Sequence, residues 1–150
     1  MKKRIVDGFT TAEAARIAGF KTPMVDYLCR TEIVIPTKRR RPGRGKPRLY
    51  SYGDLVLLRA ISRLLESRLP VKKLKTALEK QRKVFKTLTP STTVGRFLMT
   101  DGAEVLVSDD VGSFISLTTP GQMVFAFIVD VAEAQRHVDE KVAELTKAAA

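Results

Sequence analysis

Tryptophan is absent from this sequence, and aromatic residues make up only 7% of its 150 positions. Hydrophobic residues nevertheless account for 44% of the chain, which is enough to bury a core and argues against wholesale disorder. The core must therefore consist mainly of leucine, valine and isoleucine side chains. A chain of this length forms one ordinary domain or two very small ones.

Cysteine and histidine each occur once, as Cys29 and His137. A single thiol cannot form an internal disulfide, which favours a reducing cytoplasm over a secreted scaffold. Metal or redox sensing needs several thiolate or imidazole ligands, so we expect no bound metal and no cofactor. We expect Cys29 to be a buried structural residue and His137 to lie on the exposed surface.

Long apolar runs are also missing, since no stretch approaches the roughly 20 residues of a membrane span. Residues 1–4 are similar to the start of a signal peptide, but no apolar segment of adequate length follows them. No Ser/His/Asp, Cys/His or paired-carboxylate arrangement can be assembled, and residues 43–46 have the wrong spacing for a nucleotide-binding loop. The sequence thus predicts a soluble, cytoplasmic protein that is not an enzyme.

The charges divide the chain into two unequal parts. Residues 1–88 hold 23 Lys and Arg against 7 Asp and Glu, for a net charge of +16, whereas residues 89–150 hold 4 against 9, for −5. A basic half joined to an acidic half indicates two units with different roles. The basic unit is expected to bind a polyanion or an acidic surface.

The basic unit begins with two short predicted helices separated by a tight turn. Thr10 and Glu13 have the spacing of a capping box, which predicts a helix over residues 11–18 that a glycine ends. Thr22 is then the expected N-cap of a second helix over residues 23–31, with proline in its first position. Two short helices in this arrangement are typical of a helix-turn-helix motif.

A strongly basic segment follows these helices. Residues 33–35 are β-branched, which predicts a short extended segment, and residues 49–50 return to an extended pattern. Between them, residues 38–48 hold seven Lys or Arg and no apolar residue apart from two prolines. Such a segment cannot pack into a core, so we expect a solvated loop at the tip of a hairpin, which is a wing.

Two longer amphipathic helices are predicted after the wing. Ser51 and Asp54 form a second capping-box pattern, and the helix that they open runs to about Ser67. Pro70 starts a further helix over about residues 71–86. The predicted buried stripes are Leu55, Leu58, Ile61, Leu64 and Leu65 in the first helix, and Val71, Leu74 and Leu78 in the second.

The periodicity changes after a linker rich in Thr and Ser at residues 87–93. Apolar runs separated by turn residues then predict antiparallel strands, and a helical pattern of apolar residues closes the chain. The predicted strands cover residues 97–99, 103–107, 111–117 and 123–129, and the final helix covers residues 132–148.

This order of elements predicts an α+β fold in two domains. Residues 1–86 are expected to form a mostly α-helical winged helix-turn-helix that binds DNA. Residues 94–150 are expected to form a small antiparallel strand meander with a C-terminal helix, which we interpret as a dimerisation, partner or ligand domain. Its large apolar side chains fit a core better than a ligand pocket; they are Phe114, Met123, Phe125 and Phe127.

The basic unit resembles the DNA-binding domain of MerR-type transcription regulators over about residues 9–82. Residues 9–20 are similar to the first helix and turn of that family, and residues 25–28 occupy the place of its Leu-Arg-Tyr-Tyr-like signature. Residues 48–55, Arg-Leu-Tyr-Ser-Tyr-Gly-Asp-Leu, follow the family pattern Arg-x-Tyr-Ser-x-x-Asp-Leu at the expected distance. The resemblance implies a homodimer that binds and distorts DNA.

Three residues depart from the family pattern. Asp26 stands where an arginine is common, which removes a phosphate contact and adds repulsion. Glu32 and Arg68 stand where glycine is common, so each must either adopt a positive φ or end its helix differently. These departures concern the detailed DNA geometry and leave the order of elements unchanged.

The resemblance and the charge pattern together assign the residues that contact DNA. Lys21, Thr22 and Met24 are predicted to face base edges in the major groove. Tyr27 and Arg30 are predicted to reach the phosphate backbone. The wing residues predicted to follow phosphates or enter the minor groove are Arg39, Arg40, Arg41, Arg44, Lys46 and Arg48, with Tyr50 as a further phosphate ligand.

The leading hypothesis is therefore a MerR-type transcription regulator, associated with the nucleoid, that binds a double-stranded DNA operator as a homodimer. One alternative is an antitoxin, whose N-terminal half binds DNA while its C-terminal half covers a toxin as protein partner. Another is an architectural or excision factor for recombination, which bends DNA without regulating transcription.

Overall fold

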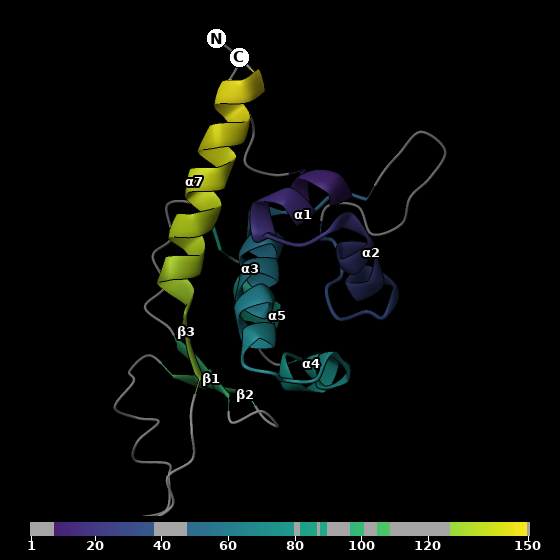
Figure 1. Ribbon diagram of the computed structural model, residues 1–150, viewed down its shortest axis with the longest axis vertical. Coiled ribbons are helices and arrows are strands. Elements are labelled where there is room, and N and C mark those ends of the chain that lie inside the picture. Colours follow the sequence, from purple (N-terminus) through teal and green to yellow (C-terminus); the bar gives the residue numbers. More distant parts are fainter. Residues whose placement is uncertain are drawn as a thin grey trace, which may run out of the picture.

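A central helix, α3 (Tyr52–Glu66), lies between the second helix and the C-terminal helix in the computed structural model, and the first helix contacts both α3 and the C-terminal helix (Figure 1). The C-terminal helix α7 (Val131–Ala149) runs along one side of α3. Helix α1 (Thr11–Ala18) contacts α3 and carries α2 (Thr22–Arg30) on the side away from α7. The structure describes residues 8–37, 48–79, 82–86, 88–89, 97–100, 105–108 and 127–149.

Helix α1 is delimited by local hydrogen bonds. The Thr10 side chain accepts a hydrogen bond from the Glu13 amide at 3.2 Å, and the Glu13 carboxylate accepts one from the Thr10 amide at 3.0 Å. Gly19 ends the helix with a φ of 89°, and its amide donates to the Ala15 carbonyl. The predicted capping box and glycine stop are confirmed.

Helix α2 starts one residue earlier than predicted. Lys21 is the N-cap, in an extended conformation and without a side-chain capping hydrogen bond, and Thr22 is the first helical residue rather than the cap. Pro23 follows in the first turn, where the amide hydrogen that it lacks has no partner within the helix in any case.

The residues after α2 fold back onto the helix instead of forming the strand predicted over residues 33–35. The amides of Ile33 and Val34 both donate to the Leu28 carbonyl, at 2.9 and 3.1 Å. Glu32 turns the chain with a φ of 62°, at the position where the MerR-like pattern has glycine. The turn buries the Ile33 and Val34 side chains in the core.

The segment before α3 pairs with the start of the described chain. Phe9 and Tyr50 form an antiparallel bridge, in which the Tyr50 amide donates to the Phe9 carbonyl at 2.7 Å and the reverse bond measures 2.8 Å. Residues 33–37 contain no strand, so they do not supply this pairing. The predicted wing tip, residues 38–47, lies outside the described residues.

Helix α3 is buried on more than one side because α1, α5 (Arg82–Lys86) and α7 all pack against it. Its predicted capping box is present, with the Ser51 side chain accepting from the Asp54 amide at 3.2 Å. Leu65 is only partly buried. The other members of the predicted stripe are buried as expected: Leu55, Leu58, Ile61 and Leu64. Further apolar residues of α3 outside this stripe are also buried, among them Val56, Leu57 and Ala60.

The single helix predicted over residues 71–86 is interrupted. A 3₁₀ turn, η1 (Val71–Lys73), continues as α4 (Leu74–Ala77), and the chain leaves the helical conformation before α5. The interruption lets Phe85 of α5 join the core over α3. A Cβ atom on Gly53 would lie 1.9 Å from the Phe85 carbonyl oxygen, so this approach requires glycine.

The C-terminal unit contains three described strands in the order β2-β1-β3. Strands β1 (Phe97–Thr100), β2 (Val105–Ser108) and β3 (Phe127–Asp130) are antiparallel, with Thr100 opposite both Val105 and Phe127. The second strand starts two residues later than predicted, and β3 pairs with β1 rather than with its predecessor in the chain. The predicted strand over residues 111–117, together with residues 123–126, lies outside the described residues.

The sheet and α7 share one hydrophobic core with the N-terminal helices. Leu98 of β1, Val129 of β3 and Val138 of α7 belong to the same buried cluster as Leu58 of α3. The α+β class is confirmed. Residues on both sides of the predicted linker, residues 87–93, thus contribute to one core.

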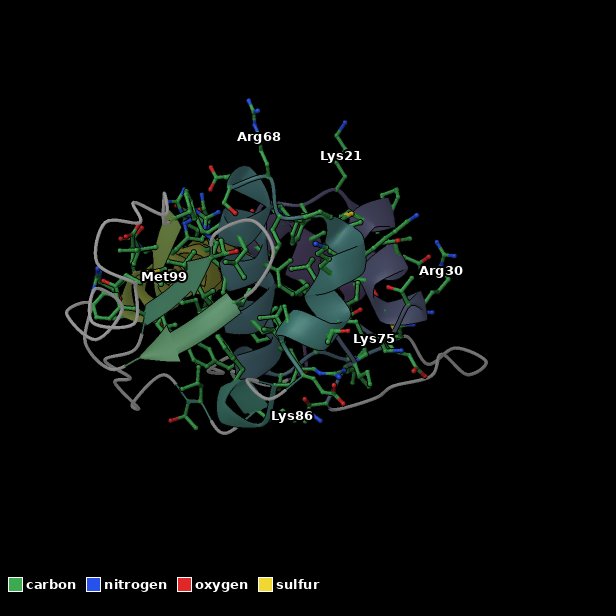
Figure 2. The ribbon with its side chains drawn as sticks, turned by 90° about the horizontal axis from the view of Figure 1, so that it is seen from below. Lys21, Arg30, Arg68, Lys75, Lys86 and Met99 are labelled. Carbon is green, nitrogen blue, oxygen red and sulfur yellow. The ribbon has the colours of Figure 1, made fainter. Side chains whose placement is uncertain are left out.

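The strain at Arg68 gives a test of this backbone geometry. Arg68 has a φ of 69° just after α3, and its side chain projects away from the molecule (Figure 2). Because a positive φ costs a non-glycine residue about 1 kcal/mol, Arg68→Gly is expected to raise the free energy of unfolding by about that amount. Urea denaturation followed by circular dichroism measures it. Arg68→Ala keeps the strain and is the matched control; a glycine variant no more stable than the alanine variant contradicts the prediction.

Candidate nucleic-acid interface

Helix α2 has a buried side and a polar side. Val25, Leu28 and Cys29 face the core, which confirms that Cys29 is a buried residue. The opposite side carries the residues predicted to contact DNA. Of these, Lys21, Thr22 and Arg30 are exposed, and Met24 and Tyr27 are half-buried at the edge of the core.

The Asp54 carboxylate ties both ends of the basic segment to the start of α3. It accepts hydrogen bonds from the Thr37 amide at 2.7 Å, the Thr37 hydroxyl at 2.8 Å and the Ser51 amide at 2.9 Å. Thr37 directly precedes the basic segment, and Ser51 comes shortly after it. With only 2% of Asp54 exposed, one buried carboxylate closes the base of this loop.

Asp26 connects the same loop to α2. Its carboxylate accepts a hydrogen bond from Arg30 Nε at 2.7 Å, one turn further along the helix, and another from Arg48 Nη1 at the end of the basic segment. These two hydrogen bonds to guanidinium groups hold the pKa of Asp26 below its usual value. The expectation that Asp26 only removes a phosphate contact is therefore incomplete, because it also orients two arginines.

Tyr50 does not fit its predicted role as a phosphate ligand. Its side chain is fully buried in the core, and this burial raises the pKa of its hydroxyl group. A buried hydroxyl cannot reach a phosphate, so Tyr50 is a core residue. Arg48 lies within the described residues, and 18% of its side chain is exposed. The other predicted wing contacts lie outside the described residues: Arg39, Arg40, Arg41, Arg44 and Lys46.

A group of exposed cations that the sequence reading did not assign to DNA lies near the end of α2. Lys75 of α4 pairs with Glu32 at 3.5 Å, and Arg82 donates to the Glu32 carbonyl at 2.9 Å. These contacts hold the α4 region against the end of α2. Lys21 and Arg68 project together from the upper edge of the molecule in Figure 2. The sequence indicates only that the basic residues at 72–75 are solvated. Their position beside α2 can be seen only in the folded structure.

Polar contacts join α7 to the N-terminal helices. The Tyr52 hydroxyl donates to the Asp139 carboxylate at 2.7 Å, and the His137 ring donates from Nε2 to the Ile17 carbonyl at 3.1 Å. The prediction that His137 is exposed is wrong, because α7 packs against α1 and leaves this side chain half-buried. Burial lowers the pKa of His137, and the positive charge of Arg59 lowers it further.

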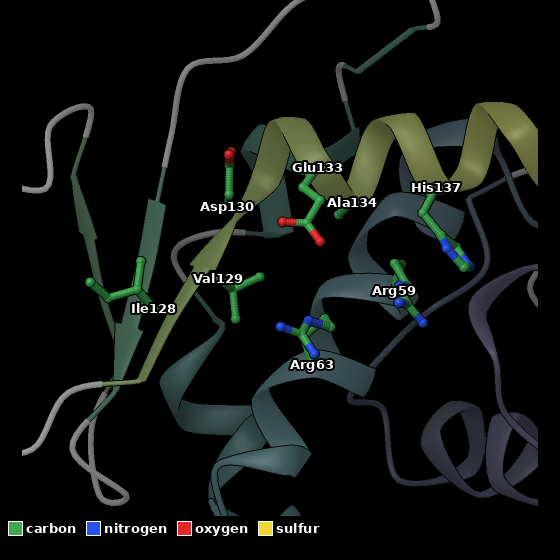
Figure 3. A pocket seen from close by; sticks show the side chains of 8 residues that line it. All are labelled: Arg59, Arg63, Ile128, Val129, Asp130, Glu133, Ala134 and His137. Carbon is green, nitrogen blue, oxygen red and sulfur yellow. The ribbon is translucent and has the colours of Figure 1, made fainter.

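A pocket of about 110 Å³ lies next to the contact between α7 and the N-terminal helices, and it is lined by α3, β3 and α7 (Figure 3). Arg59 donates to the Ala18 carbonyl at 3.3 Å, and Arg63 pairs with Glu66 and lies over the Phe127 ring. The basic groups thus have contacts within the protein that hold α3 against α1 and β3. The lining residues are Arg59, Arg63, Ile128, Val129, Asp130, Glu133, Ala134 and His137.

Other kinds of site find little support in the part of the chain that the structure describes. It contains no group of three His, Cys, Asp or Glu residues that could hold a metal ion. It also contains no helix with the length and apolar character needed to cross a membrane.

The arrangement of α1, the turn at Gly19 and the exposed polar side of α2 defines a helix-turn-helix domain, a class of DNA-binding protein. Residues 9–81 match the family described as MerR HTH family regulatory protein. Over these residues the chain is similar to the MerR family, and the resemblance stated from the sequence is confirmed.

Relatives of known sequence extend the similarity beyond this domain. The chain is 30% identical over 124 residues to two proteins named as uncharacterized HTH-type transcriptional regulators, Mb1861 of Mycobacterium bovis and Rv1830 of Mycobacterium tuberculosis. The match covers 81% of this chain and 52% of each relative. The chain therefore spans about half the length of the curated relatives it matches.

Asp54→Asn tests the closure of the loop base. An amide nitrogen cannot accept hydrogen bonds, so the Thr37 or Ser51 donors lose an acceptor, and we expect the free energy of unfolding to fall by about 2 to 3 kcal/mol. Ser51→Ala, which removes only the helix cap, should cost about 1 kcal/mol. Urea denaturation compares the two variants. The anchoring role fails if Asp54→Asn is no more destabilising than Ser51→Ala.

The lowered pKa of His137 predicts that the stability of the fold decreases as the pH falls. Its pKa is lower in the folded chain than the ordinary value of 6.5 in the unfolded chain, so the unfolded chain binds more protons as the pH falls. Stability should therefore decline as the pH drops from about 7.5 to about 5.5. His137→Gln keeps a donor for the Ile17 carbonyl but does not titrate, and thermal melts should show a flatter profile. A slope as steep as that of the wild type rules out this assignment.

Proposed function

We propose that this chain regulates transcription by binding duplex DNA as a homodimer, with α2 in the major groove and the basic segment along the phosphates. The main support is that hydrogen bonds to Asp54 and Asp26 hold the ends of that segment against α3 and α2. The segment therefore starts and ends beside the exposed side of α2, so both elements can contact one duplex. A regulator of this kind acts at the chromosome, which places it in the cytoplasm with the nucleoid.

In this proposal the two elements have separate tasks. Side chains at the start of α2 contact base edges, whereas cations of the basic segment neutralise phosphates and set the register on the duplex. We assign base-edge contacts to Lys21, Thr22 and Met24, and backbone contacts to Tyr27 and Arg30. We assign phosphate or minor-groove contacts to Arg39, Arg40, Arg41, Arg44, Lys46 and Arg48.

A homodimer suits this function because two-fold symmetric readers span two half-sites of an operator. We assign DNA binding to residues 1–86 and the dimer contact, or a contact with a protein partner, to residues 94–150. The names of the relatives point to transcriptional regulation, and no observation favours the antitoxin or recombination alternatives.

The double variant Arg40→Ala with Arg44→Ala tests the phosphate contacts of the basic segment. We expect weaker binding to every duplex sequence and a slope of log Kd against log salt that is shallower by about one unit per lost contact. Fluorescence anisotropy with a labelled duplex over a salt series measures both.

The matched control is Lys141→Ala with Lys147→Ala, which removes two charges from α7 on the far side of α3. This variant should keep the wild-type slope. If the arginine variant binds like the wild type, or if the two variants lose the same affinity, the basic segment does not contact DNA.

A further inference from the structure

Asp26 occupies the middle of the DNA-facing side of α2. Thr22, Asp26 and Arg30 follow one another at intervals of four residues, which places them along the same side of the helix. The side chains of Asp26 and Arg30 are 39% and 60% exposed, so both are accessible to a bound DNA duplex. A carboxylate at this position repels phosphate.

The Asp26 carboxylate engages two arginines from different elements. Arg30 comes from α2, and Arg48 comes from the end of the basic segment. Arg48 is only 18% exposed, so the carboxylate holds a guanidinium group with little freedom to move. A guanidinium group has five N–H donors. Arg30 is largely exposed, so its donors that are not bound to Asp26 remain available to a base edge or a phosphate, whereas Nε of Arg48 is buried.

We propose that Asp26 is a positioning residue that restrains Arg30 and Arg48 and thereby increases the selectivity of this surface for its preferred DNA sequence. The inference rests on the proposed function. On DNA of any sequence, the negative charge reduces the attraction of phosphates to the two arginines. On the preferred sequence, the fixed guanidinium groups lose little conformational freedom on binding, so less of their binding energy is lost to ordering.

The test compares two DNA probes. One is a duplex selected by the wild-type protein from a random pool, and the other is a scrambled duplex of the same length and composition. Asp26→Asn removes the charge and keeps the size of the side chain. We expect its affinity for the scrambled duplex to rise about fivefold, with a salt slope steeper by about one unit, as a freed arginine gains a phosphate contact. Its affinity for the selected duplex should change less than about twofold, so the selectivity ratio falls.

Three further variants separate positioning from a general effect of charge. Asp26→Ser removes the same charge with a smaller side chain and should also lower the ratio. Asp26→Glu keeps the charge and should keep the selectivity ratio of the wild type. Glu144→Gln removes a carboxylate that pairs with Lys141 on α7, changes the net charge equally, and should leave the ratio unchanged.

The outcomes distinguish this inference from the proposed function. If the wild type binds neither probe at low salt, the proposed function fails. If the wild type binds both probes and the two uncharged variants keep its selectivity ratio, or weaken both probes equally, the positioning role is overturned while DNA binding stands.

Discussion

The arrangement of α2, α3 and the two ends of the basic segment depends on the buried carboxylate of Asp54. Three donors from Thr37 and Ser51 converge on it, and it lies in the first turn of α3, where the helix dipole favours negative charge. A charge that is 2% exposed is costly unless its acceptor positions are filled, so the geometry of the loop base is narrowly defined. The most basic segment of the chain is thus fixed at its base by an acidic residue.

The hydrogen bonds between Asp54 and Ser51 can be predicted from the sequence, but those with Thr37 cannot. The spacing of Ser51 and Asp54 predicts a capping box because both partners lie within one helical turn, and the same reasoning predicts the start of α1 at Thr10. The bonds from Asp54 to Thr37 cross 17 positions of the chain, and no local pattern encodes them. The resemblance to the MerR pattern identified Asp54 as part of a signature, but the reason for its presence emerges only from the fold.

The incorrect predictions for Tyr50, for His137 and for the helix over residues 71–86 share a physical cause, since each involves a contact between distant parts of the chain. The resemblance and the charge pattern predict Tyr50 as a phosphate ligand of the wing, but pairing with Phe9 takes its side chain into the core. The apolar spacing over residues 71–86 fits one helix, yet the close approach of Phe85 to Gly53 requires a break. Glu32 and Arg68 are different, because the missing glycines predict either a positive φ or a different helix end, and the structure has the positive φ at both residues.

The carboxylates of α7 lie apart from the exposed side of α2. This helix carries four Asp or Glu and three Lys or Arg, and it lies on the side of α3 away from α2 (Figure 1). Asp26 breaks this separation, since it places a negative charge on α2 itself. A carboxylate in that position weakens general attraction to DNA, and it persists beside two arginines that it holds in place. Asp26 therefore differs from Glu32 at the end of the same helix, whose carboxylate pairs with Lys75, because Asp26 holds two arginines that come from different elements.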